Sequence, residues 1–162
     1  LQLISDRFGK IGSAPQLTRS NPFIEIERMV AYMKLRSSKQ VVIECDLPNE
    51  VFVMLSAPLF DWVLENLIKN ALDATEGSGK ITILASVQNK QVNITITDTG
   101  KGMDSETANQ IFEPGYTTKK RGWGLGLSLT KRIVEEYHKG KIKVLNSEIN
   151  KGTTMQVSFK KV

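Results

Sequence analysis

The chain has 162 residues, a length that suits one domain with a single sizeable core. Its 40% hydrophobic and 24% charged residues are typical of a globular protein, and no apolar run is long enough to span a bilayer. The net charge of +5 comes mainly from scattered lysines rather than from one basic stripe, which argues against nucleic-acid binding.

Cysteine and histidine, which often carry chemistry, are rare in this chain. The one cysteine, Cys45, excludes an internal disulfide and fits a reducing compartment. The one histidine, His138, has no Cys, Asp or Glu around it at metal-ligand spacing. We therefore expect Cys45 to be a core or sheet residue and His138 to have a helix-end or surface role.

The N-terminal part predicts a helix tail, a linker and then a helix. Residues 1–12 have the pattern of a helix end, and because the first residue is not Met we expect a fragment of a longer protein. The polar residues 13–20 predict a linker. A helix is expected over residues 22–36, because Asn21 can cap its first turn and Pro22 fits within that turn.

A strand pair and a long helix are predicted next. Residues 40–46 and 51–55 are rich in β-branched residues and flank a Pro-Asn turn, which predicts two paired strands. A helix should follow from the cap Ser56 to about Ala74.

The second half of the chain predicts two further hairpins, because apolar and polar residues alternate with period two. In chain order we expect strands at 80–88 and 91–98, a short helix at 105–112 capped by Ser105, a loop at 113–122, a helix to about Lys139, and strands at 140–149 and 152–162. The sum is an α+β fold, a mixed and mostly antiparallel sheet with helices on one face.

One face of the long helix carries amides. Asn66, Asn70 and Asp73 fall within a wedge of roughly 60°, opposite the apolar arc of the helix. An ordinary solvated face would give the same pattern, although Asn and Asp are poorer helix formers than Glu, Lys or Gln. An amide oxygen is also a suitable ligand for a Mg²⁺ that takes its other ligands from phosphates and water. The helix is therefore a candidate metal site, with a plain surface role as the alternative.

A carboxylate followed by glycines stands at the end of a predicted strand. Asp98 precedes Gly100 and Gly102, so a fixed carboxylate lies beside backbone that no Cβ obstructs. Such a carboxylate could accept a hydrogen bond from an exocyclic amine such as that of adenine. A tight turn with a cap is the alternative interpretation.

A second glycine-rich segment runs directly into the last predicted helix. Gly122, Gly124 and Gly126 occupy alternate positions before an amphipathic stretch. The unpaired N–H groups at a helix start, together with the helix dipole, favour phosphate. Taken alone, the segment is as well explained by a loop and a helix cap.

Together these segments resemble the ATP-binding catalytic domain of two-component sensor histidine kinases, part of the superfamily that includes gyrase, the Hsp90 chaperone and MutL. NLIKNALDA is similar to the N box, DTGKGM to the first glycine box, IFEPGYTTK to the F box and GWGLGL to the second glycine box, in the family's order. The resemblance covers roughly residues 20–160 and is strongest to nitrogen-regulator-type kinases. It implies a Bergerat-type ATP-binding fold, a two-layer α/β sandwich.

The resemblance also implies a role for each matched residue. Asn70 would be the magnesium ligand, Asn66 would lie near the transferred phosphoryl group, and Asp98 would bind the adenine. Asn66, Asn70 and Lys119 would be catalytic. The other implied nucleotide contacts are Asp73, Gly100, Gly102, Met103, Thr117, Thr118, Lys119, Arg121, Gly122, Gly124, Leu125, Gly126, Leu127 and Thr154.

The implied function is protein-histidine kinase activity with ATP and Mg²⁺ as cofactors. The γ-phosphoryl group would pass to a histidine on a separate dimerisation and phosphoacceptor helical domain, and then to a response regulator receiver domain. The resemblance makes residues 1–12 the tail of that helical domain, 13–20 a linker and 21–162 the catalytic domain. The acceptor histidine is absent, so autophosphorylation of this fragment alone is not expected.

The resemblance further implies a cytoplasmic domain, monomeric by itself, from a homodimeric parent that is compatible with anchoring in the inner membrane. The predicted partner surface comprises the helix at 22–36, the lid and apolar residues near Phe112 and Tyr116. Trp123 departs from the family, which usually has a small Ser or Thr there.

Three other functions stay open at this point. An ATP-hydrolysing machine of the gyrase and chaperone type usually carries Glu as general base where this chain has Asn66, and Asn cannot take a proton. Serine/threonine kinases share the superfamily. A degenerate module that only binds a partner is disfavoured by the intact Asn70, Asp98 and glycine boxes.

Overall fold

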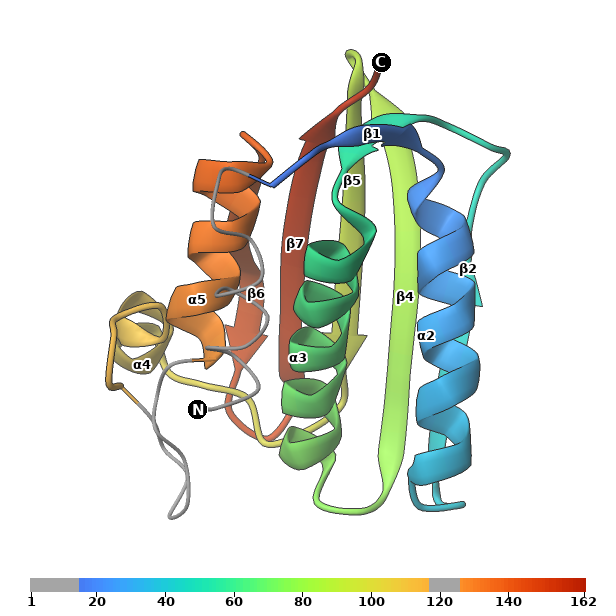
Figure 1. Cartoon of the computed structure of the whole chain (residues 1–162). Coiled ribbons are helices and arrows are strands. Elements are labelled where there is room, and N and C mark those ends of the chain that lie inside the picture. The colour runs from blue at the N-terminus through green and yellow to red at the C-terminus, as the bar shows by residue number, and fades with distance from the viewer. Residues whose placement is uncertain (1–14, 117–125) are drawn as a thin grey trace.

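Helices and strands form two layers in the computed structural model, which describes residues 15–116 and 126–162. A five-stranded sheet with the order β2-β4-β5-β7-β6 lies behind α2, α3 and α5 (Figure 1). The elements are β1 (Thr18–Ser20), α2 (Pro22–Arg36), β2 (Val41–Asp46), β3 (Val53–Leu55), α3 (Ala57–Thr75), β4 (Gly79–Gln88), β5 (Gln91–Asp98), α4 (Ser105–Gln110), α5 (Gly126–Arg132), the π-helix η1 (Ile133–Tyr137), β6 (Lys141–Glu148) and β7 (Gly152–Lys160). The predicted α+β class with helices on one face is confirmed.

Both predicted hairpins of the second half are present. β4 pairs with β5 and β6 pairs with β7, in each case antiparallel. The first turn has positive φ angles of 51° at Asn89 and 63° at Lys90, which suits a tight two-residue connection between right-twisted strands. These pairings are local, so period-two alternation around a turn is enough to predict them.

The predicted pairing of residues 40–46 with 51–55 is wrong. β2 instead pairs in parallel with β4, and β3 pairs antiparallel with β1 in a separate two-stranded sheet. The parallel partner of β2 comes only after α3, because a parallel connection needs a crossover over the sheet. β1 lies within the segment expected to be a linker, so Thr18–Ser20 are paired into a sheet.

The core lies between α3 and the sheet. Two of the central strands each turn a row of isoleucines towards the helices. The fully or nearly fully buried apolar residues of α3 are Leu59, Phe60, Val63, Leu64, Leu67, Ile68 and Ala71. Each large apolar side chain buried here stabilises the fold by about 1.5–3 kcal/mol. This burial turns the amide face of α3 away from the sheet.

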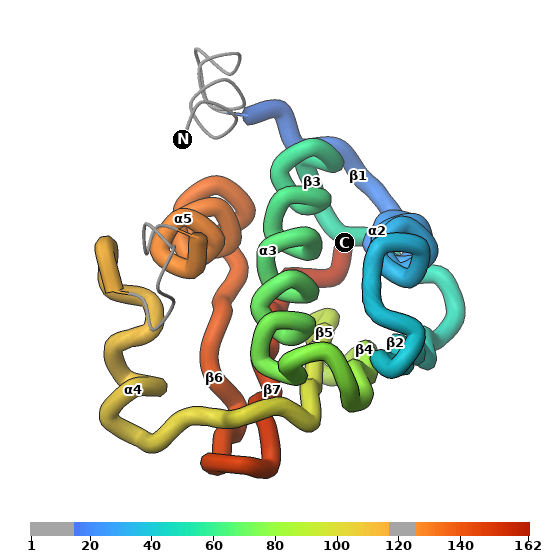
Figure 2. Tube along the Cα trace, turned by 90° about the horizontal axis from the view of Figure 1, so that it is seen from below, coloured from blue at the N-terminus to red at the C-terminus, as the bar shows by residue number. Residues whose placement is uncertain are grey.

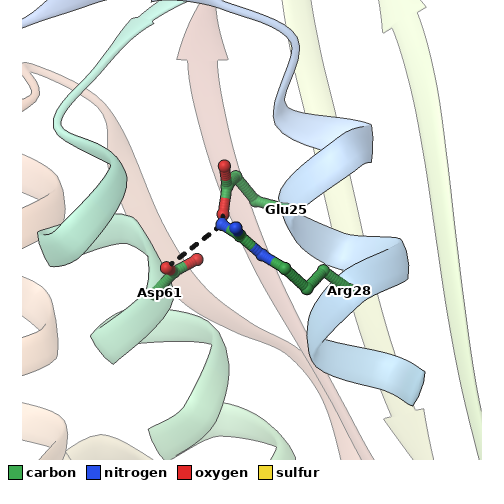
Figure 3. Close-up of polar contacts among 3 residues, drawn as sticks. All are labelled: Glu25, Arg28 and Asp61. Carbon is green, nitrogen blue, oxygen red and sulfur yellow. Dashed lines mark hydrogen bonds and ion pairs between the residues drawn. The ribbon is translucent and has the colours of Figure 1, made fainter. Parts of the chain in front are cut away.

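The predicted helix at residues 22–36 is confirmed at both ends as α2, and the Asn21 side chain accepts from the Phe23 N–H at 3.0 Å. Arg28 on α2 forms ion pairs with Glu25 on its own helix and, at 3.5 Å, with Asp61 on α3 (Figure 3). Exposed pairs of this kind contribute about 0–1 kcal/mol. Packing of the apolar side of α2 is therefore the larger stabilising term.

His138 is buried rather than on the surface. Its Nε2 accepts from the Ser56 N–H at 3.1 Å, and its Nδ1–H donates to the Ile133 carbonyl at 2.9 Å. The predicted helix-end position is correct, but the ring joins the end of η1 to the start of α3. Burial lowers the pKa of His138, opposed by the hydrogen bond to Ile133.

The free energy of unfolding is expected to fall as pH drops below about 6.5, by at most about 1.4 kcal/mol per pH unit from this group. The unfolded chain takes up a proton there that the folded ring, with its lowered pKa, does not. The stabilisation is present above that pH and is lost below it. Urea unfolding between pH 5 and 7.5 measures the slope, and a His138→Gln variant, which cannot titrate, should show a flatter profile. An equal slope in both proteins would contradict this prediction.

Two predicted helices differ in detail. The cap of α4 is Asp104, whose carboxylate accepts from the Thr107 N–H at 2.7 Å, and not Ser105. The last helix continues beyond Arg132 as the π-helix η1, which apolar periodicity does not reveal. No helix within residues 15–116 and 126–162 is both long and apolar enough to cross a membrane.

Candidate nucleotide-binding site

The C-terminal half of α3 is the centre of the candidate site. Figure 2 shows α3 between α2 and α5 on one side of the sheet. Asn66 is half-buried on α3, Asn70 is half-buried one turn further along, and Asp73 is exposed near the helix end. The predicted amide face is therefore the side of α3 that is not buried against the sheet.

Asp98 is a buried carboxylate at the end of β5, only 6% exposed. Its Oδ1 accepts from the Gly100 N–H at 2.9 Å and from the Thr153 N–H at 3.3 Å. Burial raises the pKa of Asp98, and these two hydrogen bonds oppose the rise. Among the described residues both bonds reach Oδ1, which leaves Oδ2 to accept from a ligand.

The loop after Asp98 is positioned by backbone contacts on both sides. The Lys101 N–H donates to the Ala74 carbonyl of α3 at 2.9 Å, and the Lys101 carbonyl accepts from the Asn150 N–H at 2.7 Å. A Cβ at Gly100 would overlap the Ala74 carbonyl. Gly100 is therefore required for close contact between this loop and α3. Its predicted role in allowing the base to approach stays a prediction.

Gly102→Ala is expected to destabilise the domain by at least about 2 kcal/mol, because φ is +66° and a Cβ would overlap the Glu148 carbonyl. Thermal unfolding should show a midpoint lower by at least about 5 °C. Gly77→Ala is the matched control, since φ is +94° there but a Cβ meets nothing within 4 Å. Equal losses in the two variants would show that backbone strain alone accounts for the effect.

Asn66 lies against the first residue of α5. Its Nδ2 donates to the Thr130 hydroxyl at 2.8 Å, and that hydroxyl donates to the Gly126 carbonyl at 2.7 Å. A Cβ at Gly126 would lie 2.7 Å from Asn66 Oδ1, so any larger residue there would displace the Asn66 side chain from its present position. Two predicted motifs that are 60 positions apart are thus in direct contact.

Thr154 is not brought to Asp98. Its hydroxyl bonds that of Thr97 at 2.9 Å, and both side chains stand on the opposite face of the sheet from Asp98. The neighbouring Thr153 faces Asp98 instead, in register with it and 8% exposed. Because cross-strand partners share a face of the sheet, the register of β7 against β5 is the signal that distinguishes Thr153 from Thr154.

Ser147 is a second residue that sequence reasoning missed. Its hydroxyl accepts from the Met103 N–H at 2.8 Å and lies 2.7 Å from the Thr153 hydroxyl. Met103, predicted to flank the base, is therefore attached to the β6–β7 hairpin. No local pattern distinguishes Ser147 from other strand serines, because its partners are distant in sequence.

The predicted lid and most of the second glycine box lie outside the described residues. These residues are Thr117, Thr118, Lys119, Arg121, Gly122, Gly124 and Leu125. Leu127, on the first turn of α5, is described; it is half-buried and packs against the core.

Comparison with known proteins decides the family. Residues 57–162 match the family described as histidine kinase-, DNA gyrase B- and HSP90-like ATPase. The chain belongs to this ATPase family. The match spans α3, the loop after Asp98 and the β6–β7 hairpin, so every described residue of the candidate site lies within it.

The relatives of this ATPase domain include sensor histidine kinases. It is 32% identical to an NtrY-like sensor histidine kinase of Rickettsia typhi, over 90% of this chain and 24% of that protein. It is 28% identical to the nitrogen regulation protein NtrY of Azorhizobium caulinodans, over 96% of this chain and 21% of that protein. The chain thus spans about a quarter of the length of these relatives, and the predicted likeness to nitrogen-regulator kinases is confirmed.

A solved structure agrees with the fold of this ATPase domain. The nucleotide-free catalytic domain of histidine kinase ThkA is 30% identical and superimposes with a TM-score of 0.81, over 90% of this chain and 96% of that one. Since nearly the whole of that catalytic domain aligns, the unit described here is a catalytic domain of the histidine kinase type.

Proposed function

We propose that this domain binds Mg-ATP and transfers the γ-phosphoryl group to a histidine on a separate dimerisation and phosphoacceptor domain. The observation that carries the proposal is the direct contact of Asn66 on α3 with Gly126, where the second glycine box enters α5. This contact joins the amide-lined helix to the segment that the family uses for phosphate.

The donor set suits magnesium held together with nucleotide phosphates. Within the described part of the chain no three His, Cys, Asp or Glu side chains gather as a metal site. The amide oxygen of Asn70 would be the magnesium ligand that the resemblance implies, and we add Asn66, on the same face of α3, as a second amide oxygen near the transferred phosphoryl group and the ion. Phosphates and water would complete the shell, as Mg²⁺ prefers. When bound, the ion would neutralise phosphate charge.

The base end of the nucleotide would be recognised by Asp98. Its buried carboxylate accepts hydrogen bonds only, which complements the exocyclic amine of adenine. Thr153 and Gly100 supply the backbone N–H groups that orient it. The lid residues Thr117, Thr118, Lys119 and Arg121 and the glycine box would contact the phosphates.

In the transfer step the bond between the γ-phosphorus and the bridging oxygen breaks, and a bond from the acceptor imidazole nitrogen to phosphorus forms. ADP leaves with the electron pair. The domain would contribute positioning and electrostatic stabilisation. Asn66 cannot act as general base for water, which favours transfer over hydrolysis.

The proposed partners are the phosphoacceptor helices of a homodimeric parent kinase and a response regulator receiver domain. The predicted docking surface of α2, Phe112 and Tyr116 remains a prediction. Phe112 and Tyr116 are half-buried and precede the predicted lid in the sequence, and the Lys131 ammonium lies 5.6 Å from the centre of the Phe112 ring. We place the domain in the cytoplasm, where ATP is available.

The decisive experiment supplies the missing substrate. The domain is mixed with an acceptor-helix domain from a related kinase and γ-labelled ATP. An acid-labile, base-stable phosphate should appear on the acceptor, and it should not appear on an acceptor whose histidine is replaced by Gln. Release of labelled inorganic phosphate without labelled acceptor would instead support an ATP-hydrolysing function.

A further inference from the structure

Thr130 is a buried polar residue that lies outside the four predicted motif boxes. It lies on α5 with 0% of its surface exposed. Its hydroxyl contacts two groups, the Gly126 carbonyl at 2.7 Å and Asn66 Nδ2 at 2.8 Å. The first contact is the ordinary bond of a helical threonine to the carbonyl four residues back, but the second crosses to α3.

The direction of these bonds follows from how many hydrogens are present. A hydroxyl has one hydrogen, and a carbonyl can only accept, so Thr130 uses its hydrogen on Gly126. It must then accept from Asn66, which turns Nδ2 of the amide towards α5. The Asn66 Oδ1 is consequently the atom left for other partners.

We propose that Thr130 is a positioning residue that holds the Asn66 amide with Oδ1 directed to the phosphates and their metal ion. This inference rests on the proposed function. The orientation matters because the oxygen and the N–H₂ of an amide are nearly equal in shape, while a metal ion is coordinated only by the oxygen. A freely rotating Asn66 would present a repelling N–H₂ to the ion for part of the time.

Thr130→Val tests the inference, because valine keeps the shape and removes the hydroxyl. ATP binding without Mg²⁺ should change less than twofold, whereas the gain in affinity on adding Mg²⁺ should fall by roughly 10-fold, the usual effect of losing an outer partner of a metal ligand. Thr130→Ser keeps the hydroxyl and should restore the gain. Isothermal titration with a non-hydrolysable ATP analogue measures both quantities.

Thr75→Val is the matched control. Thr75 is also buried on a helix and bonds a backbone carbonyl at 2.7 Å, that of Leu72, but does not contact Asn66. The Thr75→Val variant should be less stable than the wild type, but its affinity for ATP should rise on addition of Mg²⁺ as much as that of the wild type. If Mg²⁺ raised the ATP affinity of Thr130→Val as much as that of the wild type, the inference would be overturned.

A measurement without ligand separates this inference from the proposed function. The Asn66 side-chain amide, assigned by its absence in Asn66→Ala, should exchange slowly with solvent in the wild type and in Thr130→Ser. It should exchange at least 10-fold faster in Thr130→Val, and equal exchange would refute the inference. Wild-type protein that binds no Mg-ATP would defeat the proposed function and with it the metal-directed role of Thr130, whereas a protected amide in that protein would still show that Thr130 holds Asn66.

Discussion

Asn70→Ala should weaken Mg²⁺-dependent ATP binding by on the order of 100-fold. Loss of an outer partner of a metal ligand already costs roughly 10- to 100-fold, and the proposed direct ligand should cost at least as much. Binding without Mg²⁺ should be nearly unchanged, because Asn70 would act through the ion. Isothermal titration with a non-hydrolysable ATP analogue, with and without Mg²⁺, measures both affinities.

Asn109→Ala is the control for this experiment. Asn109 is an exposed amide on α4, which Figure 2 shows away from α3, and its loss should leave the magnesium response unchanged. Asn70→Asp keeps an oxygen but places a second negative charge beside the phosphates, so it too should bind more weakly. A magnesium response of wild-type size in Asn70→Ala would show that the metal ligand has been assigned wrongly.

Asp98→Asn should lower the affinity for ATP by roughly 10- to 100-fold, because a hydrogen bond to a charged acceptor contributes about 1.5–3 kcal/mol. Asparagine can keep its Oδ1 on the N–H groups of Gly100 and Thr153, so the fold should survive. It then presents N–H₂ to the base, where adenine also presents an amine. Two donors facing each other cannot bond.

The same variant should gain relative preference for inosine triphosphate, whose base carries a carbonyl at the position of the adenine amine. Competition between the two nucleotides measures this preference directly. Asp104→Asn serves as control, since Asp104 is an exposed helix cap and Asn caps equally well. An unchanged ratio of the two affinities in Asp98→Asn would remove Asp98 from base recognition.

Local features were predictable from the sequence for a physical reason. The start of α2 depends on Asn21 and Pro22, and the two tight hairpins depend on alternation around a turn. Each of these depends on interactions within a few residues, so the pattern of a short segment contains the information. The four motif boxes likewise could be recognised in order along the chain.

Long-range pairings could not be predicted in the same way. β2 pairs in parallel with β4, which follows α3 in the chain. β1, which lies in a segment that looks like a polar linker, pairs with β3. Both pairings join segments that are far apart in the sequence, so the pattern of one segment does not reveal its partner. His138 shows the same limit, because its partner Ser56 lies 82 positions earlier in the chain.

The sequence by itself determined the family, the helix that carries Asn66 and Asn70, and the strand that ends at Asp98. Only the tertiary structure decided that Thr153 rather than Thr154 faces Asp98, that Gly100 fits against α3, and that the Asn66 amide donates to the Thr130 hydroxyl. The physical reason is that residue types and spacing describe one segment, whereas hydrogen-bond direction and steric fit are properties of two segments in contact.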